Sequence, residues 1–90
     1  SVINNLALVY LKKDDPQKAL STCKRLFSVD EKYAKGHANA GLVYIILNDA
    51  DNAMREWNRA LELDPDLREA RQNKETLEKI LKGDEISEKA

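Results

Sequence analysis

Cysteine, proline and glycine are scarce in this chain, which has one, two and three of them in 90 residues. Cys23 therefore has no partner for an intrachain disulfide, and a cysteine-rich metal site is excluded. So few glycines and prolines leave little turn material for a sheet protein, whose strands need frequent turns. Because the β-branched residues are scattered rather than alternating with polar ones, the sequence predicts an all-α protein.

An excess of charge of one sign is also missing. The 15 basic residues are balanced by 16 acidic ones, so no strong field attracts phosphate backbones or anionic lipid. No apolar stretch approaches the roughly 20 residues that cross a bilayer, and no signal peptide is recognisable at the start. We therefore expect neither nucleic-acid binding nor membrane insertion. The compartment stays undetermined, with the cytoplasm as the default.

Helical periodicity fills most of the sequence. Apolar residues recur at spacings of three and four within residues 50–63, as they do on the buried face of an amphipathic helix. Asp15 before Pro16, and Asp64 before Pro65, have the order of a helix N-cap and a proline in the first turn. Gly83 is placed as a helix end. We predict helices over 1–13, 16–29, 33–47, 50–63 and 65–82, followed by a polar tail over 84–90.

The pattern repeats after 34 residues. A shift of that length brings Asn5 onto Asn39, Tyr10 onto Tyr44, and Asp15 onto Asp49. The connections between the predicted helices are short, so neighbouring helices must be antiparallel. Small residues at Ala7, Gly41, Ala19 and Ala53 allow the paired helices to approach closely, and Tyr10, Tyr44 and Trp57 fill the space beside them.

A helix-turn-helix unit of 34 residues resembles the tetratricopeptide repeat family. The matching residues of the second repeat are His37, Ala40, Gly41, Tyr44, Ala53, Trp57, Ala60 and Pro65, and those of the first are Ile3, Leu6, Ala7, Tyr10, Ala19, Cys23, Leu26 and Glu31. Two departures change the chemistry, because His37 replaces a tryptophan and Glu31 a proline. The resemblance implies an α-α superhelix, with repeats over 1–33 and 34–67 and a C-terminal capping helix over 68–83.

Nothing in the sequence points to catalysis, a cofactor or a metal. His37 occupies the place of a packing aromatic without a second histidine nearby, and Cys23 falls on a buried stripe without a basic neighbour. Asp14, Asp15, Asn48 and Asp49 supply too few oxygens for calcium, and we interpret them as helix caps. No glycine-rich phosphate loop or nucleophile motif is present. We expect that the chain is not an enzyme.

The resemblance implies that the first helix of each repeat lines an inner, concave side. The partner-binding residues that we predict there are Asn4, Asn5, Leu8, Lys12, Lys35, Asn39, Leu42, Ile45, Ile46 and Asn73, with Leu11, Ala38, Glu69, Arg71, Gln72 and Thr76 beside them. Asn5, Asn39 and Asn73 recur at the repeat period, and their amides can contact the backbone of an extended peptide. The alternative is that these amides only hydrate the groove. The partner that we expect is a protein or peptide.

A subset of the family grips the carboxylate end of chaperones with five lysine, asparagine and arginine side chains. Only Asn39 matches that set, because Leu8, Asn4, Glu69 and Asn73 stand at the other four places. A carboxylate carrying two charges lacks its cationic partners here. The sequence therefore predicts that this specificity is absent.

A structural role is the alternative function. Val2, Ile3 and Leu6 form an uncapped N-terminal face, which can pair two chains into a homodimer or pack on further repeats. Because the chain begins without methionine and in helical periodicity, we expect a C-terminal fragment of a larger repeat protein. A third reading is the regulatory arm of an enzyme whose catalytic part lies elsewhere.

Overall fold

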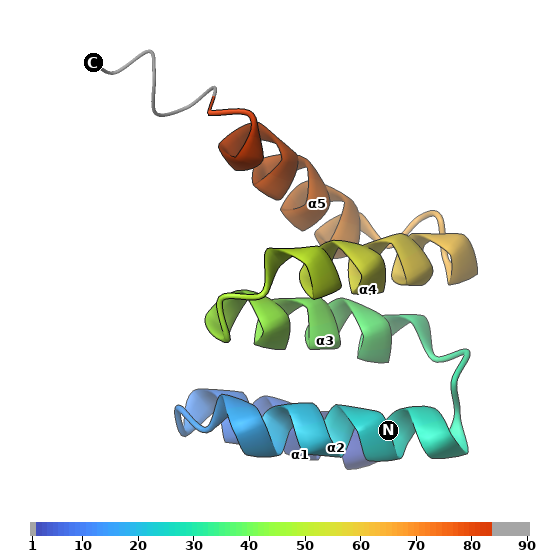
Figure 1. Ribbon diagram of the computed structural model, residues 1–90. Coiled ribbons are helices and arrows are strands. Elements are labelled where there is room, and N and C mark those ends of the chain that lie inside the picture. The colour runs from blue at the N-terminus through green and yellow to red at the C-terminus, as the bar shows by residue number, and fades with distance from the viewer. Residues whose placement is uncertain (1, 84–90) are drawn as a thin grey trace.

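A computed structural model describes residues 2–83 and contains five helices, with no strand among those residues. They are α1 (Val2–Lys12), α2 (Pro16–Val29), α3 (Ala34–Ile46), α4 (Ala50–Leu63) and α5 (Arg68–Leu81). The helices stack in chain order, with the α1–α2 pair below the α3–α4 pair and α5 above them (Figure 1). The prediction of an all-α protein built from antiparallel helix pairs is confirmed. None of the described helices has the length and apolar character of a membrane span.

Two turns within the helix pairs have the same geometry 34 residues apart. Asp14 and Asn48 both adopt the left-handed conformation, with φ of 61°, which these residue types tolerate at a helix end. Asp15 and Asp49 then cap α2 and α4, and each carboxylate accepts a hydrogen bond from the backbone N–H three residues later at 3.2 Å. The prediction that these four residues are helix caps is confirmed.

The predicted start of the fifth helix is wrong. Asp64 and Pro65 do not open α5, because Asp64 closes α4 and its carboxylate accepts a hydrogen bond from the Asp66 N–H at 3.1 Å. Asp30 makes the same turn after α2, accepting from the Lys32 N–H at 3.3 Å. The fifth helix therefore begins at Arg68, and the predicted tail over 84–90 lies outside the described residues.

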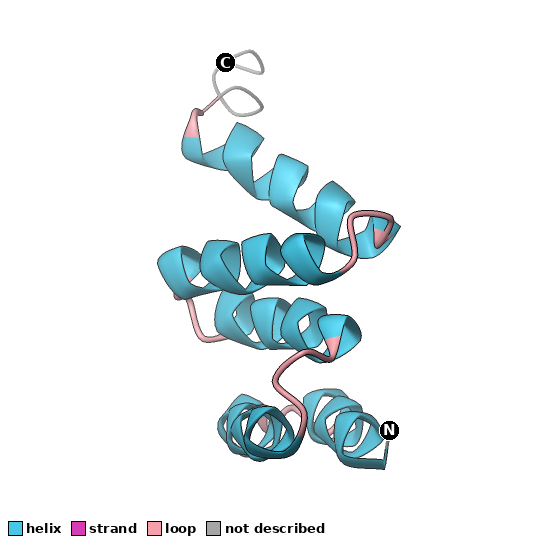
Figure 2. Cartoon of the chain, turned by 90° about the vertical axis from the view of Figure 1, so that its right-hand side faces the viewer, coloured by secondary structure: helices cyan, strands magenta, loops and turns pink. Residues whose placement is uncertain are grey.

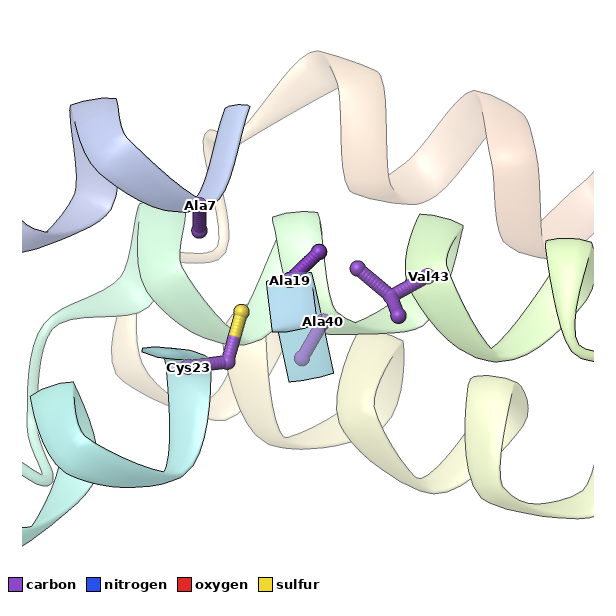
Figure 3. Packing of buried hydrophobic residues seen from close by; sticks show 5 residues of the cluster. All are labelled: Ala7, Ala19, Cys23, Ala40 and Val43. Carbon is purple, nitrogen blue, oxygen red and sulfur yellow. The ribbon is translucent and has the colours of Figure 1, made fainter. Parts of the chain in front are cut away.

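Small side chains fill the contact between the first three helices. Ala7 of α1, Ala19 and Cys23 of α2, and Ala40 and Val43 of α3 are all buried and face one another (Figure 3). Because alanines hold most of these places, the helix axes can approach closely. A second cluster joins α4 to α5, and its members are Ala53, Trp57, Ala60, Ala70 and Leu77.

The C-terminal end of α5 packs less than the sequence suggested. The sequence places Leu67, Ala70, Leu77, Ile80 and Leu81 on one side of this helix, but only Ala70 and Leu77 are buried. Ile80 is 45% exposed and Leu81 is 62% exposed. The helix runs obliquely across α4, so that its last turns diverge from the rest of the stack (Figures 1 and 2).

Candidate functional site

One face of α3 lines two neighbouring grooves. Its contributing side chains are spaced by three or four residues and therefore share one side of the helix: Lys35, Ala38, Asn39, Leu42 and Ile45. The same spacing holds on α5, where Glu69, Asn73, Thr76 and Ile80 line the grooves. The two grooves thus follow one another along α3 and α5.

The first of them, the polar groove, lies at the N-terminal ends of α1, α3 and α5 and has a volume of about 290 Å³. Its lining is Asn4, Asn5, Leu8, Tyr33, Lys35, Ala38, Asn39, Leu67 and Glu69. Nδ2 of Asn39 donates a hydrogen bond to Oδ1 of Asn4 at 2.9 Å, and Asn4 is only 5% exposed. The buried amide of α1 thereby fixes the orientation of the Asn39 side chain on α3.

The second, the apolar groove, lies between the C-terminal halves of α3 and α5 and has a volume of about 200 Å³. Its lining is Leu42, Ile45, Trp57, Asn73, Thr76, Leu77 and Ile80. None of these side chains is ionisable in the physiological range. Trp57 is nearly fully buried and its Nε1–H donates to the carbonyl of Ala38 at 3.1 Å, so the indole has a fixed position beside the groove.

The structure places most of the predicted partner-binding residues in these grooves. Asn4, Asn5, Leu8, Lys35 and Asn39 lie in the polar groove, and Leu42, Ile45 and Asn73 lie in the apolar groove. Lys12 and Ile46 are exposed and line neither of the two. Whether these residues touch a partner remains a prediction.

Several of the residues that line the two grooves were not identified from the sequence. Tyr33 and Leu67 are 34 residues apart and precede α3 and α5 at the N-cap position. The repeat period would have found this pair. The sequence gives Trp57 a packing role alone, but it also lines the apolar groove, as do Leu77 and Ile80 of α5.

His37 is buried at the junction of the two repeats, where both of its ring nitrogens have partners. Nε2 lies 2.7 Å from the carbonyl oxygen of Glu31, and Nδ1 lies 2.7 Å from Oε1 of Glu56. Its ring stacks on Phe27 with centroids 4.0 Å apart. The Nε2 contact is to the main chain of Glu31 and not to its side chain, and the expected packing role of His37 is confirmed by its burial and its stacking on Phe27.

Among residues 2–83, three titratable groups have shifted pKa values. Burial, with a smaller contribution from Glu56, raises the pKa of the Cys23 thiol to about 11. Burial also raises the pKa of Tyr44. The amide side chain of Asn52 and its backbone N–H lower the pKa of Asp49, which they bond. A thiol with a raised pKa is a poor nucleophile at neutral pH, so the buried Cys23 serves packing.

The uncapped end of the stack carries exposed apolar side chains. Val2 is 84% exposed, Leu6 lies at the margin of exposure, and Ile3 is half-buried. Val9 continues the same row one turn further along α1 and is also exposed. The residues predicted for self-association therefore lie on the surface in part, and their pairing with a second chain remains a prediction.

Two family models, both described as tetratricopeptide repeat, match residues 1–33 and 34–67. The chain belongs to the tetratricopeptide repeat family, whose repeats are generally non-catalytic modules of protein interaction. The resemblance noted in the sequence is thereby confirmed.

Solved structures support the same fold. The NMR structure of the first TPR domain of human RPAP3 superposes with a TM-score of 0.84 at 24% identity, over 92% of this chain and 65% of that one. The first TPR of Spaghetti (RPAP3), bound to the HSP90 peptide SRMEEVD, gives a TM-score of 0.83 at 24% identity, over 88% and 63%. This chain thus spans slightly less than two thirds of either structure.

Proposed function

We propose that this chain is a non-catalytic interaction module that holds an extended segment of a partner protein on the face formed by α1, α3 and α5. The observation that carries the proposal is the pair of grooves along one face of α3. The resemblance to the repeat family implies that this face is the inner, concave side of the superhelix. The neighbouring Spaghetti structure, which holds a peptide, supports a role of this kind.

The length of the grooves fits a short segment. Lys35 and Ile45 are ten residues apart on α3, which is about 15 Å of helix axis. An extended chain rises about 3.3 Å per residue, so this distance corresponds to four or five residues of a partner. A contact of that size is smaller than the standard interface of about 800 Å² per partner, and we expect micromolar or weaker affinity.

The charges of the polar groove argue against an acidic C-terminal peptide as the partner. Lys35 and Glu69 both line it, so one positive charge is offset by one negative charge. SRMEEVD, the peptide in the Spaghetti structure, carries several carboxylates. A groove without a surplus of cations gives these carboxylates no compensation for their lost hydration. SRMEEVD therefore serves as the negative comparison peptide in the binding experiment.

The experiment is a selection followed by mapping. The chain is used to select binders from a library of acetylated and amidated nonapeptides, and the best binder is titrated into ¹⁵N-labelled protein. We expect chemical-shift changes at Asn5, Asn39 and Ile45, and weaker binding of SRMEEVD. Shifts confined to the outer helices, around Arg55 and Arg59, would refute binding at this face.

Self-association is a second candidate function, favoured by the exposed apolar row on α1. Val2, Leu6 and Val9 are spaced as neighbours on one side of that helix, and each exposes part of its side chain. A second copy that covered this row would remove apolar surface from water. Sedimentation equilibrium over a range of concentrations tests the idea. A dimer that Leu6→Lys abolishes supports it, and a monomer at millimolar concentration excludes it.

A further inference from the structure

The apolar groove has the size of a side-chain pocket. Its volume of about 200 Å³ is below the roughly 300–1,000 Å³ of pockets that enclose small molecules or cofactors. Leu42 and Ile45 border it on α3, and Leu77 and Ile80 border it on α5. Ile45 is 39% exposed and Ile80 45%, so the groove is open to solvent between two aliphatic walls.

The chemistry of the lining selects the kind of side chain that fits. A charged side chain would lose water on entry, and no ionisable group of the lining would compensate for that loss. An aliphatic side chain loses no hydrogen bonds there and gains contact with Leu42, Ile45 and Ile80. The groove is therefore complementary to an uncharged, aliphatic residue of a partner.

Asn39 can make a second contact with the same partner segment, through its carboxamide. One of its two Nδ2 hydrogens is taken by Asn4, which holds the carboxamide in place. Within the part of the chain that the structure describes, Oδ1 of Asn39 accepts no hydrogen bond, and the second Nδ2 hydrogen is not used. The side chain thus offers one acceptor and one donor, which complement the N–H and C=O groups of a peptide backbone.

The separation of these two features sets a spacing. Asn39 and Ile45 are six residues apart on α3, which is about 9 Å along the helix axis. At about 3.3 Å per residue, an extended peptide covers that distance in about three residues.

We propose that the apolar groove binds one aliphatic side chain of an extended partner segment, about three residues from the peptide unit that bonds Asn39. The inference rests on the proposed function and gives it a ligand chemistry: an uncharged leucine, isoleucine, valine or methionine at a fixed distance from a backbone contact. Asn4 is a positioning residue in this arrangement, because it acts on the ligand through Asn39.

The test uses two matched pairs of variants and the nonapeptide selected with the full chain. Ile45→Lys and Ile80→Lys place a charge in the apolar groove. Val29→Lys and Leu81→Lys add the same charge at exposed apolar positions, and neither of these residues lines that groove. All four positions are exposed, so folding should survive, and circular dichroism checks that it does. Binding is followed by the fluorescence of Trp57, the only tryptophan in the chain.

We expect the two groove variants to weaken binding at least tenfold and the two control variants to change it less than twofold. The selected peptides should share one aliphatic position, and moving that residue by one place should cause a similar loss. Equal losses in all four lysine variants, or none in any, would overturn the aliphatic site. If Asn39→Ala still weakens binding in that case, the proposed function stands without it.

Two further outcomes separate failure of the proposed function from occupation of the apolar groove by a second copy of the chain. If the selection yields no binder, or the shifts map to the outer helices, the proposed function fails and the inference fails with it. If the unliganded protein dimerises and Ile80→Lys alone abolishes the dimer, a second copy occupies the groove. That result overturns the inference and leaves peptide binding at the polar groove to be judged by the Asn39→Ala variant.

Discussion

The backbone of Gly41 in α3 lies directly against the indole of Trp57 in α4. A Cβ atom added to Gly41 would lie 2.7 Å from both Cδ1 and Cε2 of the ring and closer still to Nε1. The same Nε1–H bonds the carbonyl of Ala38, so the ring cannot easily withdraw. The close approach of the two helices thus depends on the missing side chain at residue 41.

Gly41→Ala should destabilise the protein, although the same change in an open helix stabilises it. Alanine is favoured over glycine by about 1 kcal/mol in a helix interior, and the clash with Trp57 must exceed this gain. For Gly41→Leu we expect a loss of about 1–3 kcal/mol from overpacking. Urea unfolding measures both changes. A Gly41→Ala protein that is more stable than the parent would show that the contact is loose.

Trp57→Ala should cost about 3–5 kcal/mol, because it removes a large buried side chain between α3, α4 and α5. Trp57→Phe keeps an aromatic ring but loses the hydrogen bond to the Ala38 carbonyl. The loss of that bond alone should lower the free energy of unfolding by about 1 kcal/mol. Denaturant unfolding of both variants separates the packing from the hydrogen bond. Equal stability of the parent and Trp57→Ala would contradict this packing.

The repeat period predicted more of the fold than the local signals did. It correctly relates the turns at Asp14 and Asn48, and it would also place the start of α5 34 residues after Ala34, at Arg68. The pair Asp64–Pro65 gave the wrong start for α5. A side-chain acceptor followed by proline can close one helix as well as open the next. Only the tertiary repeat distinguishes these two uses.

The grooves were predictable in part. The polar residues of α1 and α3 could be placed on one side from the helical spacing, and the structure puts Asn5 and Asn39 in one groove. The hydrogen bond between Asn4 and Asn39 joins two helices and has no signal in local sequence. The opening beside Ile80 depends on the oblique course of α5, which is set by packing and not by periodicity (Figure 1).

Removal of the contact between His37 and Glu56 should loosen the junction of the two repeats. His37→Phe preserves an aromatic ring against Phe27 but leaves the Glu56 carboxylate and the Glu31 carbonyl without their partner. We expect a loss of about 1–3 kcal/mol, since the half-buried carboxylate of Glu56 loses its hydrogen-bond donor. A double-mutant cycle with Glu56→Ala, which removes the acceptor, isolates the pair. Additive losses in that cycle would show that the two side chains do not interact.

Stability should fall in alkaline solution as Cys23 ionises in the unfolded chain. The pKa of the thiol is about 11 in the folded protein, against 9.0 for an unperturbed thiol. Because the folded state disfavours the thiolate, its contribution to stability is complete below pH 9 and is lost as the pH rises towards 11. Tyr44 acts in the same direction, because its pKa is also raised.

Thermal melts from pH 7 to 11 on the parent and on Cys23→Ala measure the contribution of the thiol. We expect Cys23→Ala to be less stable at pH 7, because it leaves a cavity in the cluster with Ala7 and Val43 (Figure 3). The difference between the two proteins should shrink as the pH rises, since only the parent has a thiol to ionise. Alkylation gives a second measure, because the raised pKa of Cys23 lowers the fraction of thiolate that can react at pH 8. A Cys23 that reacts in the folded protein as fast as a free thiol would contradict its burial.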